Sequence, residues 1–129
     1  MVTARVLIID DDAALQKLVV TLLKRAGIES ISALSAMEAV EELKKRPLPD
    51  IILLDLMLPD VSGIEFLKQM RSKPIFNDTP VIILSAVADP DQIREGLEAG
   101  ADRYLTKPYL ASNLITTLQD VLRTGRKKK

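Results

Sequence analysis

The sequence predicts an α/β protein of the (βα)5 type, in which a doubly wound parallel sheet of five strands carries helices on both faces. Two observations support this fold class. Short apolar runs alternate along the chain with segments of helical periodicity, and the chain has 129 residues, 47% of them apolar. Strands that alternate with helices form right-handed βαβ units and therefore a parallel sheet. A chain of this length predicts a single domain.

Five runs of Val, Ile and Leu are predicted to form the strands. Polar residues do not alternate with apolar ones inside these runs, a pattern typical of strands that helices cover on both faces. The runs span residues 6–9, 31–34, 51–54, 81–84 and, more weakly, 104–105. Every strand is therefore expected to be buried on both faces.

The first two intervening segments are predicted to be helices because their apolar residues recur every three or four positions. The first helix begins its apolar face at Leu15 and ends at Gly27, because glycine commonly terminates helices. The second spans residues 35–46 and stops before Pro47.

Three further helices follow the later strands. One begins near Ser62, and one follows Pro90 with only Ile93 and Leu97 as strongly apolar residues. The last helix ends at Gly125. The helix after Pro90 is therefore expected to bury a narrow face.

The composition limits the available chemistry. The chain has no Cys and no His, which excludes disulfides, zinc sites built from these residues, and Ser-His or Cys-His catalytic pairs. A bound metal would have to be a hard ion with oxygen ligands. No apolar run approaches the roughly 18 residues that span a bilayer, and no signal segment opens the chain. The sequence therefore predicts a cytoplasmic protein without membrane contact.

The formal charges balance, with 18 basic and 18 acidic residues, but they are unevenly distributed. Residues 126–129 are all basic, which leaves 14 basic against 18 acidic residues over 1–125. We therefore predict a domain over residues 1–125, followed by a basic tail or the start of a linker over residues 126–129. Four basic residues without a basic face or an aromatic platform do not predict direct nucleic-acid binding.

Polar side chains follow four of the predicted strands. Asp10 and Asp11 follow the first strand, and Asp55 follows the third. Ser85 follows the fourth strand and Lys107 the fifth. Ligands of open α/β sheets bind outside the carboxyl ends of the strands, so we expect these side chains to converge. Each of them taken alone also has an ordinary explanation as a cap, a turn residue or a solvated group.

Three carboxylates in one crevice would repel one another. At about 4 Å and an effective dielectric near 20, each pair costs on the order of 4 kcal/mol. Mg²⁺ would relieve this repulsion, because it binds carboxylates, backbone carbonyls, waters and phosphate oxygens. A metal-bound carboxylate beside an amine and a hydroxyl suits phosphoryl transfer, with an aspartyl phosphate as the product.

With these residues in place, the chain resembles the response-regulator receiver domain of two-component signalling over about residues 4–123. Four segments in the same order carry the resemblance: VLIIDDD at 6–12, DIILLDLMLP at 50–59 with Gly63, PVIILSA at 80–86 and GADRYLTKP at 100–108. The resemblance implies a flavodoxin-like strand order of 2-1-3-4-5. It also implies a phosphoacceptor that assists its own phosphorylation rather than an enzyme.

The resemblance assigns a role to each acidic residue of the crevice. Asp55 is expected to be the phosphoacceptor. Asp10 and Asp11, together with Asp55, are expected to hold Mg²⁺, and the backbone carbonyl of Met57 would complete the protein ligands.

The resemblance also assigns the remaining polar groups. Ser85 and Lys107 are expected to bind the phosphoryl group, and Tyr104 is expected to act with Ser85 as an aromatic switch. The bond between Lys107 and Pro108 is similar to one that is cis in the family.

Three side chains bear on how the phosphoryl group is positioned and on how fast it is hydrolysed. Ser85 stands where Thr is more common, which keeps the hydroxyl but loosens its positioning. The resemblance implies that the positions of Met57 and Val87 bear on hydrolysis of the phosphoryl group, and neither side chain can orient a water by hydrogen bonding. Slow autodephosphorylation is therefore predicted.

The resemblance implies a sensor histidine kinase or a phosphotransfer protein as the phosphodonor. Phosphorylation would shift the surface formed by the fourth helix, fifth strand and fifth helix, which could also form a homodimer. The target would be a downstream protein or an output domain of a longer chain.

Two other classes of protein match the sequence less well. A haloacid-dehalogenase-like Mg²⁺ phosphatase would use Asp10 as the nucleophile and Asp12 as the acid. However, Ala14 stands where such a motif has Thr or Val, and the chain leaves no room for a cap domain. A flavodoxin-like cofactor binder would need a phosphate-binding loop after the first strand, where this chain has acids that repel phosphate.

Overall fold

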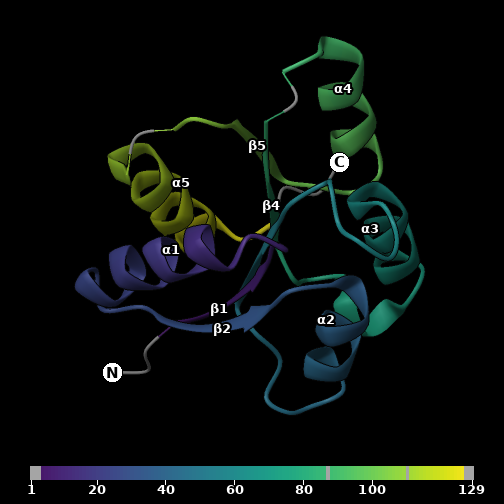
Figure 1. Ribbon diagram of the computed structural model, residues 1–129. Coiled ribbons are helices and arrows are strands. Elements are labelled where there is room, and N and C mark those ends of the chain that lie inside the picture. Colours follow the sequence, from purple (N-terminus) through teal and green to yellow (C-terminus); the bar gives the residue numbers. More distant parts are fainter. Residues whose placement is uncertain (1–3, 87, 110, 127–129) are drawn as a thin grey trace.

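A computed structural model describes residues 4–86, 88–109 and 111–126 of the protein. Five strands in these ranges form one parallel sheet with the order β2-β1-β3-β4-β5 (Figure 1). The strands are β1 (Arg5–Ile9), β2 (Glu29–Ala33), β3 (Ile51–Leu54), β4 (Val81–Ser85) and β5 (Arg103–Thr106). The predicted fold class and strand order are confirmed.

Helices cover both faces of the sheet (Figure 1). The helices α1 (Ala13–Arg25) and α5 (Ala111–Thr124) pack on one face, where Val19, Leu23 and Leu118 contribute to an apolar core. The other face carries α2 (Ala36–Leu43), α3 (Gly63–Arg71) and α4 (Pro90–Glu98), and a short 3-10 helix, η1 (Pro74–Phe76), follows α3. The sequence did not predict η1. Because all the strand pairs are parallel, the carboxyl ends of the strands lie at the same edge of the sheet.

Polar side chains start four of these helices. The side chains of Asp12, Ser35 and Ser62 each accept a hydrogen bond from a backbone N–H in the first turn of α1, α2 and α3. Asp89 does the same for α4. Such caps satisfy N–H groups that have no partner inside the helix. Capping therefore accounts for Asp12, but it does not account for the two acids that precede it.

The prediction that every strand is buried on both faces is wrong for β2 and β5. Only Ala33 is buried in β2, and all four residues of β5 are half-buried. Both strands lie at an edge of the sheet, where a strand has one neighbour instead of two. The second strand also begins two residues earlier than predicted, at Glu29, and α2 ends at Leu43 rather than at residue 46.

The helix α4 buries even less than its sequence predicts. Gly96 is its one buried residue, while Leu97 is 43% exposed. A Cβ atom on Gly96 would lie 2.7 Å from Cδ1 of Ile83, so a larger residue at this position would have to displace the end of that side chain. The packing of α4 thus depends on a close backbone approach rather than on large side chains.

A second charged cluster lies at the amino ends of the strands, far from the predicted site. The carboxylate of Asp102 accepts hydrogen bonds from Arg126 at 3.0 Å, from the backbone N–H of Val81 at 2.9 Å and from Arg71 at 3.3 Å. Burial lowers the pKa of Arg71 to about 10, and the neighbouring charge of Arg126 adds to this effect. Arg126, the first residue of the predicted tail, therefore contacts the domain, whereas residues 127–129 lie outside the described residues.

Candidate functional site

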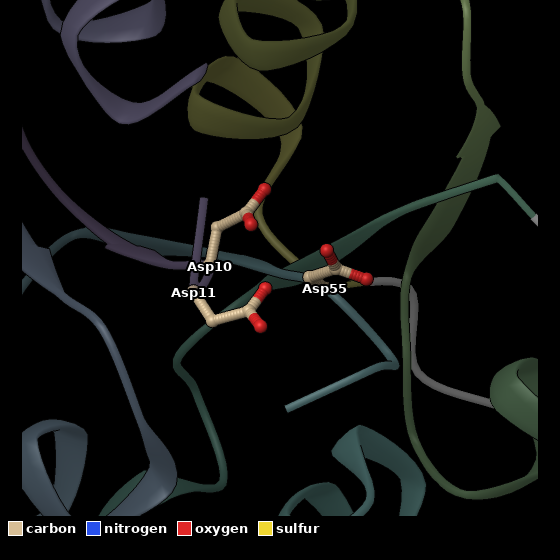
Figure 2. Close-up of side chains that lie close together, drawn as sticks. All are labelled: Asp10, Asp11 and Asp55. Carbon is tan, nitrogen blue, oxygen red and sulfur yellow. The ribbon is translucent and has the colours of Figure 1, made fainter. Parts of the chain in front are cut away.

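The structure brings together the three acids that the sequence placed after β1 and β3 (Figure 2). One carboxylate oxygen from each of Asp10, Asp11 and Asp55 lies within 4.8 Å of the other two. Adjacent strands explain this closeness, because Ile9 at the end of β1 is in register with Leu54 at the end of β3. These three acids therefore occupy the centre of the carboxyl edge.

Lys107 lies between two of these acids. Its ammonium nitrogen is 3.0 Å from Oδ2 of Asp10 and 3.1 Å from Oδ2 of Asp55, and its side chain is only 19% exposed. Burial alone would lower the pKa of Lys107, but the hydrogen bonds and charges of the two carboxylates outweigh burial and raise that pKa. The lysine therefore remains a cation at neutral pH and neutralises part of the acidic cluster.

The backbone around Lys107 is held by β4. Its N–H donates to the carbonyl oxygen of Ser85 at 2.7 Å, and the peptide bond between Lys107 and Pro108 is cis, as the resemblance implied. Ser85 is itself fully buried at the end of β4, in register with Thr106 of β5. The residues predicted to supply the hydroxyl and the amine thus lie at the ends of neighbouring strands, Ser85 as the last residue of β4 and Lys107 directly after β5.

Asp10 is the most buried of the three acids, with 5% of its surface exposed. Burial raises its pKa, and the charge of Asp55 adds to this rise. Hydrogen bonds from the N–H of Asp12 and from Lys107 offset the effect only in part. The ionised form of Asp10 therefore costs folding free energy at neutral pH when no metal is bound.

Replacing Asp10 with Asn is expected to raise the melting temperature of the metal-free protein by roughly 2–5 °C. A pKa that is higher in the folded than in the unfolded state means that stability is lost as the pH rises through the folded value. At neutral pH the substitution removes that loss, although it also removes one partner of Lys107. Thermal denaturation in EDTA measures the effect, and Asp12→Asn, an exposed acid in the same loop, is the control. An unchanged or lower melting temperature for Asp10→Asn would contradict this account.

Asp55 is held by contacts on both of its oxygens. Oδ1 accepts a hydrogen bond from the N–H of Met57 at 3.1 Å, while Oδ2 faces Lys107. Gly63 lies directly behind the backbone of Asp55, where a Cβ atom would collide with the carbonyl oxygen of Asp55 and with Cα of Leu56. The first turn of α3 therefore packs against the backbone of Asp55 because residue 63 is a glycine.

Asp60 has a role that the sequence did not predict. Its two carboxylate oxygens accept hydrogen bonds from the N–H groups of Ala36 at 3.0 Å and of Met37 at 2.9 Å, at the start of α2. These bonds lower the pKa of Asp60. The loop that carries Met57 is thereby tied to α2. The contact joins residues 24 positions apart, so no local sequence signal reports it.

Tyr104 lies on β5 beside α4. It is half-buried, is in register with Ile83, and has ring carbons 3.5 Å from the position that a Cβ atom on Gly96 would take. The predicted switch residue therefore packs where α4 approaches the sheet most closely. Val87, the other residue in the hydrolysis prediction, lies outside the described residues.

The donor set of the acidic cluster fits a hard divalent cation. All three side chains offer carboxylate oxygens, the ligands that Mg²⁺ prefers. Asp11 is exposed, and within the described part of the chain no hydrogen bond to its carboxylate is present, so its oxygens are available to a ligand. The geometry thus supports a metal site at this edge of the sheet.

The fold and the site together define a class: a flavodoxin-like α/β domain with a carboxylate and lysine centre at the carboxyl edge of its sheet. A comparison with protein families matches residues 6–119 to the response regulator receiver domain. The chain belongs to this family, whose members are receiver domains of two-component systems and act in signalling rather than as classical enzymes.

Individual relatives support the same assignment. The chain is 37% identical over 119 residues to the phosphate regulon transcriptional regulatory protein PhoB of Escherichia coli, covering 92% of this chain and 52% of that protein. It is 34% identical to the DNA-binding response regulator MtrA of Mycobacterium leprae, covering 92% and 51%. The chain thus spans about half the length of the curated relatives it matches.

Solved structures show the same fold. The receiver domain of the Francisella response regulator 1452 matches with a TM-score of 0.86 and 36% identity, covering 94% of this chain and 98% of that one. The chemotaxis response regulator CheY4 of Vibrio cholerae matches with a TM-score of 0.86 and 32% identity, covering 93% and 99%. In the part of this chain that the structure describes, no helix is long and apolar enough to cross a membrane.

Proposed function

We propose that this domain is a phosphoacceptor in which Mg²⁺-dependent phosphorylation of Asp55 controls a partner or an output domain. The observation that carries the proposal is the Lys107 ammonium held within 3.1 Å of Asp10 and Asp55, beside the cluster of three carboxylates. A lysine in this place can neutralise negative charge on an incoming phosphoryl group. The phosphodonor would be a sensor histidine kinase or a phosphotransfer protein.

The reaction needs an oriented carboxylate and cationic donors around it. A carboxylate oxygen of Asp55 forms a bond to phosphorus while the bond between phosphorus and the donor breaks, and the electron pair of that bond leaves with the donor. The N–H of Met57 holds one oxygen of Asp55, which limits rotation of the carboxylate. Lys107 and the hydroxyl of Ser85 would bind the phosphoryl oxygens.

The metal would be held by Asp10, Asp11 and Asp55, with the backbone carbonyl of Met57 as a further ligand. When bound, Mg²⁺ would neutralise charge on the carboxylates and on the phosphoryl oxygens. Lys107 already neutralises part of the charge on Asp10 and Asp55, so the exposed Asp11 offers the least compensated carboxylate to the cation.

The output surface would be formed by α4, β5 and α5. The helix α4 is weakly anchored, since Gly96 is its one buried residue, and Tyr104 packs at that point. A change at Ser85 that reorients Tyr104 would therefore act directly on α4. The same surface could bind a downstream protein, an output domain or a second copy of this chain. The name of PhoB favours a transcriptional output for that longer relative, and the name of MtrA favours a DNA-binding one.

Phosphorylation can be tested with a small phosphodonor. We expect incubation with acetyl phosphate and Mg²⁺ to add one phosphoryl group, which intact-mass and peptide-mass analysis would place on Asp55. The label should be absent without Mg²⁺ and absent in Asp55→Ala. A label on Asp10, or steady turnover of phosphate esters, would instead favour the haloacid-dehalogenase-like alternative.

The lifetime of the phosphorylated form provides a separate prediction. Because Met57 and Val87 cannot orient a water, autodephosphorylation should be slow. Replacing both, as Met57→Asn with Val87→Glu, is expected to shorten the lifetime of the phosphorylated protein by about tenfold or more, the usual range for gaining a group that assists proton transfer or positions water. Loss of the label over time, followed by mass, measures the rate. Equal lifetimes in both proteins would show that these positions do not limit hydrolysis.

A further inference from the structure

Gln16 is a buried polar residue for which the proposed chemistry has no use. It is the fourth residue of α1 and is only 4% exposed. Its Nε2 atom is 2.9 Å from the carbonyl oxygen of Ile8, 3.0 Å from that of Ala33 and 3.2 Å from that of Asp10. One carboxamide therefore links the carboxyl ends of β1 and β2 at the point where Asp10 and Asp11 leave the sheet.

The orientation of this carboxamide is fixed by its surroundings. Its Oε1 atom is buried and has no hydrogen-bond partner within the described residues. An unpaired buried acceptor costs free energy, yet turning the amide over would place Oε1 against three carbonyl oxygens. Gln16 therefore contributes to this region through the hydrogen bonds that Nε2 donates and not through Oε1.

Those hydrogen bonds act on the backbone that carries the acidic pair. Asp10 has further anchors, since its carboxylate accepts from Lys107 and from the N–H of Asp12. Among the residues that the structure describes, none donates a hydrogen bond to the side chain of Asp11, so its place in the cluster depends on the backbone. The bond from Gln16 to the carbonyl oxygen of Asp10 fixes the peptide plane that joins Asp10 to Asp11.

We propose that Gln16 is a positioning residue for the metal site, which preorganises Asp11 by holding the carbonyl oxygens at the ends of β1 and β2. This proposal rests on the proposed function, because it assumes that the acidic cluster binds Mg²⁺. Removing a group that orients a metal ligand without touching the metal typically weakens metal affinity by about 10-fold to 100-fold. Gln16 acts on the affinity for the metal and takes no part in phosphoryl transfer.

The test is to replace Gln16 with Met and to titrate the unphosphorylated protein with Mg²⁺ by calorimetry. Met is similar in length and volume, and it removes both N–H groups, which are shared among the three carbonyl oxygens, together with the unpaired acceptor. We expect the Kd for Mg²⁺ to rise about 10-fold or more. The rate of phosphorylation by acetyl phosphate at saturating Mg²⁺ should stay within about twofold of wild type, because the reacting groups are untouched.

The control is Gln69→Met, the same chemical change at an exposed position of α3, which should leave the Kd unchanged. A Kd for Gln16→Met within about twofold of wild type would overturn the proposal, as would a slower rate at saturating Mg²⁺ with an unchanged Kd. If Gln16→Met does not fold, the same titration on Gln16→Leu decides the question. A wild-type protein that binds no Mg²⁺ would instead refute the proposed function, so the two failures are distinguishable.

Discussion

Replacing Lys107 with Met is expected to slow phosphorylation of Asp55 by about 100-fold or more, the usual cost of removing one donor that stabilises developing charge. The ammonium lies 3.1 Å from Oδ2 of Asp55, so it is in place to bind the phosphoryl oxygens as the new bond forms. It also carries the positive charge that compensates Asp10. Without it, two poorly exposed carboxylates face each other with no ion-pair partner among the described residues.

Initial rates with acetyl phosphate at saturating Mg²⁺ measure this effect. The matched control is Lys68→Met, the same substitution at an exposed position of α3, which should leave the rate unchanged. A rate within about threefold of wild type for Lys107→Met would show that the lysine supports the fold but not the transfer. Urea denaturation of both variants separates a loss of folded protein from a loss of chemistry.

The second large effect is a loss of folding stability when the charged cluster around Asp102, at the amino ends of the strands, is disrupted. Asp102→Ala is expected to lower the free energy of unfolding by about 3 kcal/mol, because removing one partner of a buried ion pair leaves the other charge uncompensated. The side chain of Asp102 is 6% exposed and that of Arg71 is 11% exposed. The variant would also leave the N–H of Val81 and the guanidinium of Arg126 without their carboxylate.

Asp120→Ala provides a close control. Asp120 also pairs with two arginines, Arg103 at 3.2 Å and Arg123 at 2.6 Å, but its side chain is 40% exposed. Solvent screens such pairs, so this variant should lose no more than about 1 kcal/mol. Chemical denaturation of both variants measures the difference. Equal losses would show that burial does not strengthen the cluster around Asp102.

Local sequence patterns were sufficient for the centre of the fold. The runs 6–9, 51–54 and 81–84 in β1, β3 and β4 are apolar and buried at every residue, because helices cover both faces of these strands. The same patterns were misleading at the sheet edges, where β2 and β5 are partly exposed. The number of neighbours that a strand has is set by the assembled sheet and not by the strand itself.

Residue order also predicted the acidic cluster, for a physical reason. The carboxyl ends of parallel strands lie at one edge, so Asp10, Asp11 and Asp55 had to be near one another once the strands were assigned. The sequence did not show that the ammonium of Lys107 would lie between the carboxylates of Asp10 and Asp55. Its place between two carboxylates depends on side-chain packing across 97 residues in one case and 52 in the other.

The sequence by itself determined the fold class, the strand order through its resemblance to a known family, and the edge of the sheet where the charged groups gather. Only the tertiary structure decided that Asp60 caps α2, that Gln16 holds the ends of β1 and β2, and that Arg126 docks onto Asp102. The difference has one physical origin. Helical periodicity and caps such as Asp12 are set by residues close together in the sequence, whereas these three contacts join groups that become neighbours only when the chain has folded.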